Sequence, residues 1–195
     1  MYNMNKRVVI ADDEPITRMD LAEILKEAGY DVVGEASDGF DAIELCRKTK
    51  PNLILMDIKM PLLDGLKASK IINNESLADC IVLLTAYSGK EFIEEAKAAG
   101  VMGYVIKPIN EKSLLPAIEI ALSKSEEIQE IRSESQKSKE SLEDRKKIEK
   151  AKGILMREEN LTEAEAYNKI RKISMDKRCQ MKNIAEIIIL NAEGN

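Results

Sequence analysis

Apolar runs that end in carboxylates constrain this chain most strongly. Val8–Ala11 is followed at once by Asp12 and Asp13, and Leu53–Met56 is followed by Asp57. Short continuous apolar runs are typical of strands buried on both faces of a parallel sheet. The carboxyl ends of such strands share one edge, where open α/β sheets bind ligands. We therefore expect three carboxylates to converge there, an arrangement that favours a hard divalent cation, Mg²⁺ above all.

Strand-like and helix-like segments alternate through the first part of the chain. Apolar runs predict strands at 8–11, 53–56, 81–84 and 102–106, and a further strand is expected at 31–36. Helical periodicity predicts helices at 16–28, 38–48, 66–72, 91–99 and from 111 onward. Gly29 and Gly100 stand where helix-ending glycines are common, and Pro51 follows another helix end. This alternation predicts an α/β fold with a doubly wound parallel sheet.

The composition excludes several classes of protein. No apolar stretch approaches the roughly 20 residues of a membrane span, and the first residues do not resemble a signal peptide, so we expect a cytoplasmic protein. Cys46, Cys80 and Cys179 are scattered, and the chain has no histidine. We therefore expect buried thiols rather than disulfides or a zinc site. Without histidine most hydrolase mechanisms lose their usual general base, and we expect no enzyme and no catalytic residue.

Thr85 and Lys107 complete the expected site. Each ends a predicted strand, so each should lie at the same edge as the carboxylates. A hydroxyl and an ammonium there can hold the oxygens of a phosphoryl group on Asp57 while a metal ion neutralises the others.

These residues, in this order, resemble the receiver domain of two-component response regulators over roughly the first 120 residues. The matching motifs are Asp12-Asp13, Asp57 within the stretch 55–65, Thr85-Ala86 and Lys107-Pro108. The resemblance implies a flavodoxin-like sheet with strand order 2-1-3-4-5.

The resemblance also implies a role for each site residue. Asp57 accepts a phosphoryl group from a sensor histidine kinase, and Mg²⁺ is held by Asp13, Asp57 and the Lys59 carbonyl directly and by Asp12 through water. Tyr104 matches the aromatic residue that turns inward when Thr85 moves toward the phosphoryl group. Lys107-Pro108 matches a peptide bond that is usually cis. Asp64-Gly65 is interpreted simply as a turn.

The second part of the chain differs in kind. It has no glycine from Glu111 until Gly153 and no proline beyond Pro116, so one long helix can leave the sheet and continue. A poor heptad frame predicts at most a weak coiled coil, and an unpaired polar linker is the alternative. The frame consists of Leu114, Ala117, Ala121, Lys124, Ile128, Ile131, Ser135, Ser138 and Leu142.

Three amphipathic helices are predicted after this linker, at 145–157, 163–175 and 182–190. Thr162 and Glu165 have the spacing of a capping box, with Leu161 placed as its hydrophobic staple. The apolar run Ile187–Leu190 exceeds one helical stripe and indicates contact with another surface, such as a second subunit.

The stretch 145–156 and its continuation at 165–171 and 184–185 resemble ANTAR domains, the RNA-binding modules of transcription antitermination regulators. The resemblance implies an RNA-binding surface that includes Arg145, Lys146, Ala151, Lys152, Gly153, Arg157 and Arg171. Gly153 lies inside a helix, where glycine costs about 1 kcal/mol relative to alanine. We interpret it as a point of close approach by RNA or a neighbouring helix, or as a packing glycine.

The sequence thus predicts a receiver at 1–122, a helical linker at 123–142 and an RNA-binding domain at 143–195. The expected function is antitermination, with phosphorylation promoting a homodimer that binds hairpins in nascent RNA. The overall character is most similar to regulators of ethanolamine utilisation. Two alternatives stay open, a DNA-binding transcription factor and a phosphotransfer or protein-interaction module without nucleic acid; the absence of an evident turn and recognition helix disfavours the first.

Overall fold

The computed structural model of the chain describes residues 6–86 and 90–193, of which 90–93 by their backbone only. The chain divides into two compact units, and the boundary between them falls between Gln129 and Glu130. We call the first the sheet unit and the second the helical unit.

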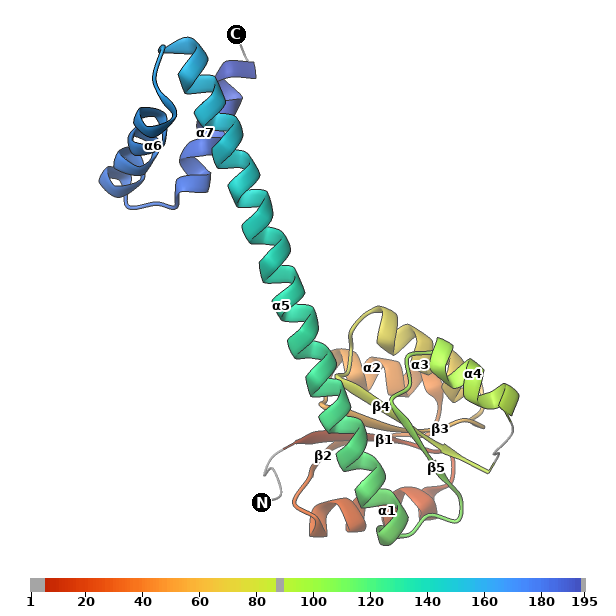
Figure 1. The fold of residues 1–195 in the computed structure, drawn as a ribbon. Helices are drawn as coiled ribbons and strands as arrows, with labels where there is room; N and C mark the ends of the chain where they lie inside the picture. The colour runs from red at the N-terminus through yellow and green to blue at the C-terminus, as the bar shows by residue number, and fades with distance from the viewer. Residues whose placement is uncertain (1–5, 87–89, 194–195) are drawn as a thin grey trace. The chain divides into compact units, whose positions relative to one another are not determined.

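The sheet unit contains five parallel strands in the order β2-β1-β3-β4-β5, which confirms the predicted topology (Figure 1). The strands are β1 (Arg7–Ala11), β2 (Asp31–Ala36), β3 (Leu53–Asp57), β4 (Cys80–Thr85) and β5 (Gly103–Ile106). The helices between them are α1 (Pro15–Glu27), α2 (Gly39–Thr49), α3 (Gly65–Asn74) and α4 (Lys90–Ala98), and α5 (Glu111–Glu158) follows β5.

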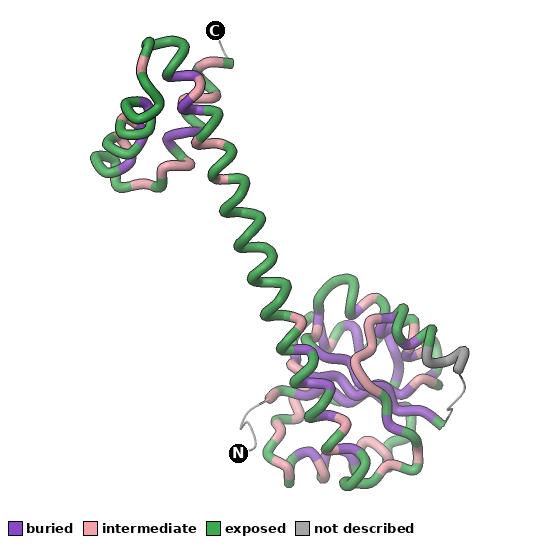
Figure 2. Tube along the Cα trace, in the orientation of Figure 1, coloured by how far each residue is buried: buried purple, intermediate pink, exposed green. Residues whose placement is uncertain are grey.

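Each face of the sheet has its own apolar core. Side chains of α1 and of the first part of α5 pack on one face, against Val8, Leu53 and Val82. Those of α2, α3 and α4 pack on the other, against Val9, Ile54 and Leu83. The inner strands β1, β3 and β4 are the most buried part of this unit (Figure 2). Burial on both faces explains why the inner strands β1, β3 and β4 are nearly continuous apolar runs without alternation.

The helix ends follow the sequence signals. Gly29 and Gly100 have positive φ angles of 85° and 78°, which glycine adopts without steric cost. The Lys107-Pro108 peptide bond is cis, as the resemblance implied.

The simple-turn interpretation of Asp64-Gly65 was wrong. Asp64 caps α3, because its side chain accepts a hydrogen bond of 2.9 Å from the Lys67 N–H. A Cβ on Gly65 would lie 1.9 Å from the carbonyl oxygen of Asp57, so no larger residue fits without moving the loop. Both residues therefore support the end of β3.

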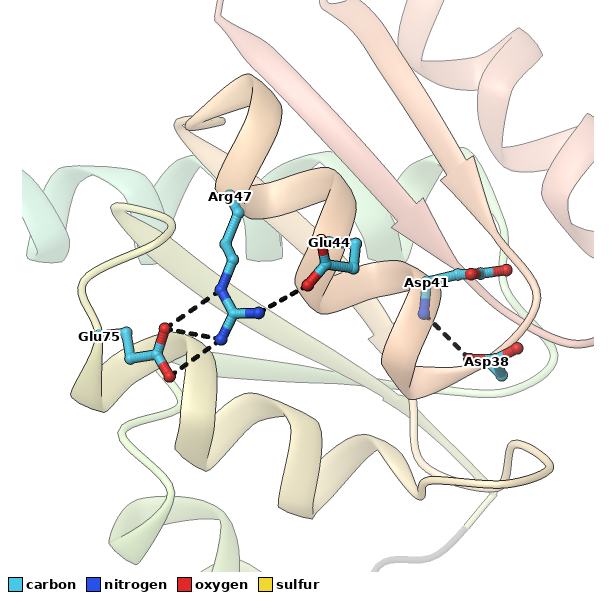
Figure 3. A network of polar contacts seen from close by, with 5 residues as sticks. All are labelled: Asp38, Asp41, Glu44, Arg47 and Glu75. Atoms are coloured by element: carbon cyan, nitrogen blue, oxygen red, sulfur yellow. Dashed lines mark hydrogen bonds and ion pairs between the residues drawn. The ribbon is translucent and has the colours of Figure 1, made fainter.

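A polar network joins α2 to the end of α3 (Figure 3). The Arg47 guanidinium contacts the Glu75 carboxylate at 2.9 Å and the Glu44 carboxylate at 2.6 Å. Asp38 caps α2 by accepting hydrogen bonds from the backbone N–H groups of Phe40 and Asp41. The network is largely exposed, so it orients the two helices more than it stabilises them.

A polar clamp holds α5 against the amino ends of the strands. Ser125, which is 3% exposed, donates a 2.5 Å hydrogen bond to the backbone carbonyl of Asp79. The Asp79 carboxylate accepts from Gln129 at 3.1 Å and from Asn52 at 2.9 Å. The clamp fixes α5 for about two turns beyond the last buried apolar residue of that helix in this unit, Leu122.

Burial corrects part of the predicted heptad seam. Leu114 and Ala121 are buried in the core of the sheet unit, and Ala117 packs against it. The same helical face cannot also pair with a second helix. The seam is therefore available only from Lys124 onward, and every residue from 130 to 143 is exposed.

The helical unit is built from the end of α5, α6 (Glu163–Lys177) and α7 (Met181–Glu193). Ala151, Leu155, Ala166, Ile170, Ile184 and Ala185 form its core. The predicted capping box is present: the Thr162 side chain accepts from the Glu165 N–H, and the Glu165 carboxylate accepts from the Thr162 N–H. Among the described residues, no helix has the length and apolarity that crossing a membrane requires.

Candidate functional site

Strand register brings the predicted residues to one edge of the sheet. Ala11 pairs with Met56, and Asp57 pairs with Leu84, so Asp12 and Asp57 leave adjacent strands side by side. Thr85 pairs with Ile106, and the Lys107 N–H donates a 2.8 Å hydrogen bond to the Thr85 carbonyl. Parallel strands expose their carboxyl ends together, and that is why four distant segments meet here.

Three carboxylates and one ammonium form the centre of the site. Asp12, Asp13 and Asp57 offer oxygens that all lie within 4.8 Å of one another. The Lys107 Nζ lies 2.8 Å from Asp12 Oδ2 and 3.0 Å from Asp57 Oδ1. Asp12 and Asp57 are buried, whereas Asp13 is exposed and leaves the cluster open to solvent.

The electrostatics of Asp57 follow from this burial. Removal from water raises the pKa of the Asp57 carboxyl above its usual value, and the ammonium of Lys107 opposes the rise. Burial lowers the pKa of Lys107, but its hydrogen bonds to Asp12 and Asp57 outweigh this, and the pKa is raised. One lysine facing three carboxylates leaves an excess of negative charge that suits a divalent cation with oxygen ligands.

Hydrogen bonds to β2, to the Asp12 carboxylate and from the Arg18 side chain hold the loop after β1. The Asp12 N–H donates to the Ala36 carbonyl at 3.1 Å, and the Glu14 N–H donates to Asp12 Oδ1 at 2.9 Å. The Arg18 guanidinium donates to the Asp12 carbonyl at 2.7 Å. These contacts fix the two consecutive aspartates relative to the sheet.

The remaining predicted residues surround this centre. Thr85 is buried at the end of β4, and Lys59 lies in the loop two residues after Asp57. Tyr104 lies on β5 with 42% of its surface exposed, which corresponds to an outward position.

In the helical unit, four of the predicted RNA-binding cations are available to a ligand. Arg145, Lys146, Arg157 and Arg171 are exposed, and none has an ion-pair partner within the part of the chain that the structure describes. Lys146 also lines a groove of about 460 Å³ between α5 and α7, with Lys147, Lys150, Glu186, Ile189 and Leu190. Lys147 and Lys150 are paired there with Glu186 and Glu193.

Two predicted RNA contacts are not placed on this surface. The Lys152 side chain is only 7% exposed, and its ammonium lies 2.9 Å from Glu149 and 2.7 Å from Glu163. The first carboxylate is one helical turn away and the second begins α6, so Lys152 joins two helices. Ala151 is fully buried in the core. Both residues therefore support the fold of the helical unit.

Gly153 occupies open space. A Cβ at this position would meet nothing within 4 Å among the described residues. The packing interpretation was therefore wrong within this chain, and so was close approach by one of its own helices. Approach by RNA or by another molecule stays a prediction.

Sequence reasoning missed two groups of residues. Arg18 gave a weak signal, a basic residue one turn into the helix that follows the paired aspartates. Ser125 and Gln129 gave another, since two polar residues four apart lie on one helical face. Neither signal indicates the carbonyl or carboxylate that each contacts.

Comparison with known proteins agrees with both parts of this description. The family model of the response regulator receiver domain matches residues 8–119, and that of the ANTAR domain matches residues 136–189. The transcriptional regulatory protein PdtaR of Mycobacterium tuberculosis is 45% identical over 184 residues, which cover 94% of this chain and 89% of PdtaR. The narrower resemblance to ethanolamine-utilisation regulators stays a prediction from the sequence.

Matches to receivers alone cover the sheet unit. The chemotaxis protein CheY of Thermotoga maritima is 36% identical over 115 residues, 59% of this chain and 96% of CheY. The solved structure of a two-component response regulator from Aurantimonas sp. SI85-9A1 has a TM-score of 0.55 and 33% identity, covering 67% of this chain and 96% of that one. The chain therefore belongs to the response regulators, with an amino-terminal receiver domain and a carboxy-terminal ANTAR domain.

Proposed function

We propose that this response regulator is phosphorylated on Asp57 by a sensor histidine kinase and then, as a dimer, binds hairpins in nascent RNA so that transcription continues. The observation that carries the proposal is the contact of Lys107 with both Asp12 and Asp57 beside the exposed Asp13. In the proposal, the buried Asp57 is the nucleophile, the Lys107 ammonium lies beside it, and the open edge at Asp13 binds the divalent cation.

Phosphoryl transfer needs little covalent chemistry from the protein beyond the nucleophile. An Asp57 oxygen attacks the phosphorus of the kinase's phosphohistidine, the nitrogen–phosphorus bond breaks, and an acyl phosphate forms on Asp57. Lys107 lies where its ammonium can contact the new phosphoryl oxygens, and the Thr85 hydroxyl is a second donor at the same edge.

The acidic cluster suits Mg²⁺, the ion that prefers carboxylate and carbonyl oxygens. Asp13, Asp57 and the Lys59 carbonyl are the proposed direct ligands, with Asp12 acting through water. When bound, the ion neutralises charge on the incoming phosphate.

Labelling with a small phosphodonor and Mg²⁺ tests the phosphoacceptor. Wild-type protein should be labelled, whereas Asp57→Ala and wild type with a chelator should not. Asp41→Ala is the matched control, because Asp41 is an exposed aspartate on α2 that does not belong to the carboxylate cluster. Undiminished labelling of Asp57→Ala would sink the assignment.

The proposed RNA surface consists of Arg145, Lys146, Arg157, Arg171 and the open Gly153. Exposed cations without carboxylate partners can neutralise phosphates without first breaking an ion pair. Tyr167, 43% exposed, is the one aromatic residue of the helical unit. Stacking on many unpaired bases is therefore not the expected mode, and phosphate contacts on a structured RNA fit better.

Filter retention at several salt concentrations tests this surface. Structured RNA should bind more tightly than duplex DNA of matched length. Arg157→Ala should weaken binding and reduce the salt slope by about one. Arg47→Ala, an exposed arginine of the sheet unit, is the control and should change neither. Equal binding of duplex DNA would support a DNA-binding regulator, and no binding of either would support a module without nucleic acid.

Self-association is the proposed link between the two activities. Phosphoryl-Asp57 would draw in Thr85 and let the outward Tyr104 turn inward, favouring receiver pairing. The exposed part of α5 then adds a weak seam that includes Ile131, Ser135, Ser138 and Leu142, whose polar positions keep unphosphorylated chains largely apart. Two paired chains present two RNA-binding surfaces at high effective concentration.

A further inference from the structure

The Arg18 side chain on α1 is largely covered, unlike those of its exposed neighbours on the same helix. Its side chain is 18% exposed, whereas Ile16 and Met19 are 74% and 69% exposed. Side chains on a helix tilt toward its amino end, so an arginine one turn into α1 reaches back over the loop after β1. There its Nη1 donates a 2.7 Å hydrogen bond to the Asp12 carbonyl.

We infer that Arg18 is a positioning residue for the cation site, acting through the peptide bond between Asp12 and Asp13. That peptide is planar, so fixing its carbonyl oxygen also fixes the direction in which Asp13 leaves the loop. Asp12 is already held by Lys107 and by the Glu14 N–H, but Asp13 is exposed and has no such contact within the described residues. Arg18 supplies the missing constraint.

Glu35 completes the arrangement. Its carboxylate lies 3.5 Å from Arg18 Nε, and it stands on β2 directly beside Ile10 of β1 in the strand register. The guanidinium is therefore held between a strand and the loop it orients. Glu35 also offsets the positive charge of Arg18, which would otherwise repel a divalent cation at the neighbouring carboxylates.

Geometry and charge predict opposite results for removal of Arg18. If it acts as a nearby positive charge, Arg18→Ala should bind Mg²⁺ more tightly. If it acts by positioning Asp13, the same variant should bind Mg²⁺ more weakly, by about 3- to 10-fold, since only part of the free energy of the lost hydrogen bond contributes to metal binding. The contacts favour positioning, because Arg18 donates directly to the Asp12 carbonyl and Glu35 offsets part of its charge.

Titration calorimetry of the unphosphorylated full-length chain with MgCl₂ measures this directly. Arg18→Ala should show the weaker binding, and Arg18→Lys, which keeps the charge and loses the planar fork, should be intermediate. Arg47→Ala, whose ion pairs lie on α2 and α3, should match the wild type. Thermal unfolding without metal shows whether each variant folds.

A second readout separates positioning from general damage. The inference rests on the proposed phosphorylation of Asp57, so labelling by a small phosphodonor is followed as Mg²⁺ is raised. Arg18→Ala should need more Mg²⁺ for half-maximal labelling and approach the wild-type rate at saturation, because the bound ion then orders the carboxylates itself. Wild-type Mg²⁺ affinity in Arg18→Ala, or tighter binding, overturns the positioning role alone. A wild-type chain that binds no Mg²⁺ overturns this inference and the proposed function together.

Discussion

At the scale of single residues, Gly65 limits what the end of β3 tolerates. A Cβ there would lie 1.9 Å from the Asp57 carbonyl oxygen and 2.9 Å from the Met56 side chain. The backbone oxygen cannot yield as a flexible side chain would, so Gly65→Ala should lower the free energy of unfolding by about 2–3 kcal/mol. It should also slow labelling of Asp57, because the loop that carries Lys59 must shift. Urea unfolding and phosphodonor labelling check the two effects, and unchanged values for both would contradict the packing.

Substitution of Gly153 by alanine should change the free energy of unfolding in the opposite direction. Since a Cβ meets nothing within 4 Å, Gly153→Ala should raise the free energy of unfolding of the helical unit by about 0.5–1 kcal/mol through helix propensity alone. If RNA approaches this bare turn of α5, the more stable variant should nevertheless bind RNA less tightly. A stabilised variant with wild-type affinity for RNA would show that Gly153 is not part of the RNA-binding surface.

The buried thiols give a pH dependence. Burial raises the pKa of Cys46 and of Cys80 to about 12, against 9.0 for an exposed thiol. Above pH 9 the unfolded chain loses these protons while the folded chain keeps them, so stability falls as pH rises through this window. Each thiol contributes at most about 1.4 kcal/mol per pH unit. Urea unfolding of a Cys46→Ala/Cys80→Ala double variant should show a flatter decline between pH 9 and 10.5 than the wild type, and a parallel decline would be inconsistent with buried neutral thiols.

At the scale of elements, the clamp around Asp79 determines where α5 is anchored. Ser125→Ala leaves the Asp79 carbonyl without its 2.5 Å partner, which should cost about 1–2 kcal/mol because the group is buried. Hydrogen exchange should accelerate at residues 119–129 and stay unchanged in β1. The neighbouring exposed Ser123→Ala is the control. Acceleration across the whole sheet would indicate global destabilisation instead of a local clamp.

The elements of the sheet unit were predictable because period and length identify them. Apolar runs identified four of the five strands, β2 being a mixed segment between two helices, and the resemblance supplied the strand order. The long α5 followed from the absence of glycine between Glu111 and Gly153 and of proline beyond Pro116. The helical period does not reveal what covers the apolar face of α5. Leu114 and Ala121 fit a heptad seam, but they pack against the sheet.

The candidate site was predictable only where strand ends fix it. Register brings Asp12, Asp13, Asp57 and Lys107 together, and strand order alone implies as much. No strand register fixes the positions of the predicted RNA-binding residues. Lys152 is neutralised partly by Glu163 from the next helix, a contact that the spacing within α5 does not contain. The tertiary contacts of long cationic side chains depend on interhelical packing that a single sequence does not define.

At the scale of the whole molecule, phosphorylation is the proposed input and RNA binding the proposed output, joined by self-association. Unphosphorylated chains should sediment as monomers at low concentration, since the available seam of α5 is polar at Lys124, Ser135 and Ser138. Phosphorylated chains should sediment as dimers. Asp57→Ala should stay monomeric under both conditions.

The most direct test measures the affinity of the full-length protein for a structured RNA together with its sedimenting mass, with and without phosphodonor. We expect phosphodonor and Mg²⁺ to raise the affinity for RNA by at least about tenfold in step with dimer formation, as avidity requires, and Asp57→Ala to abolish both changes. A phosphorylated chain that binds RNA tightly while remaining a monomer at all concentrations would contradict this expectation, and would indicate instead that the receiver masks the RNA-binding domain until Asp57 is phosphorylated.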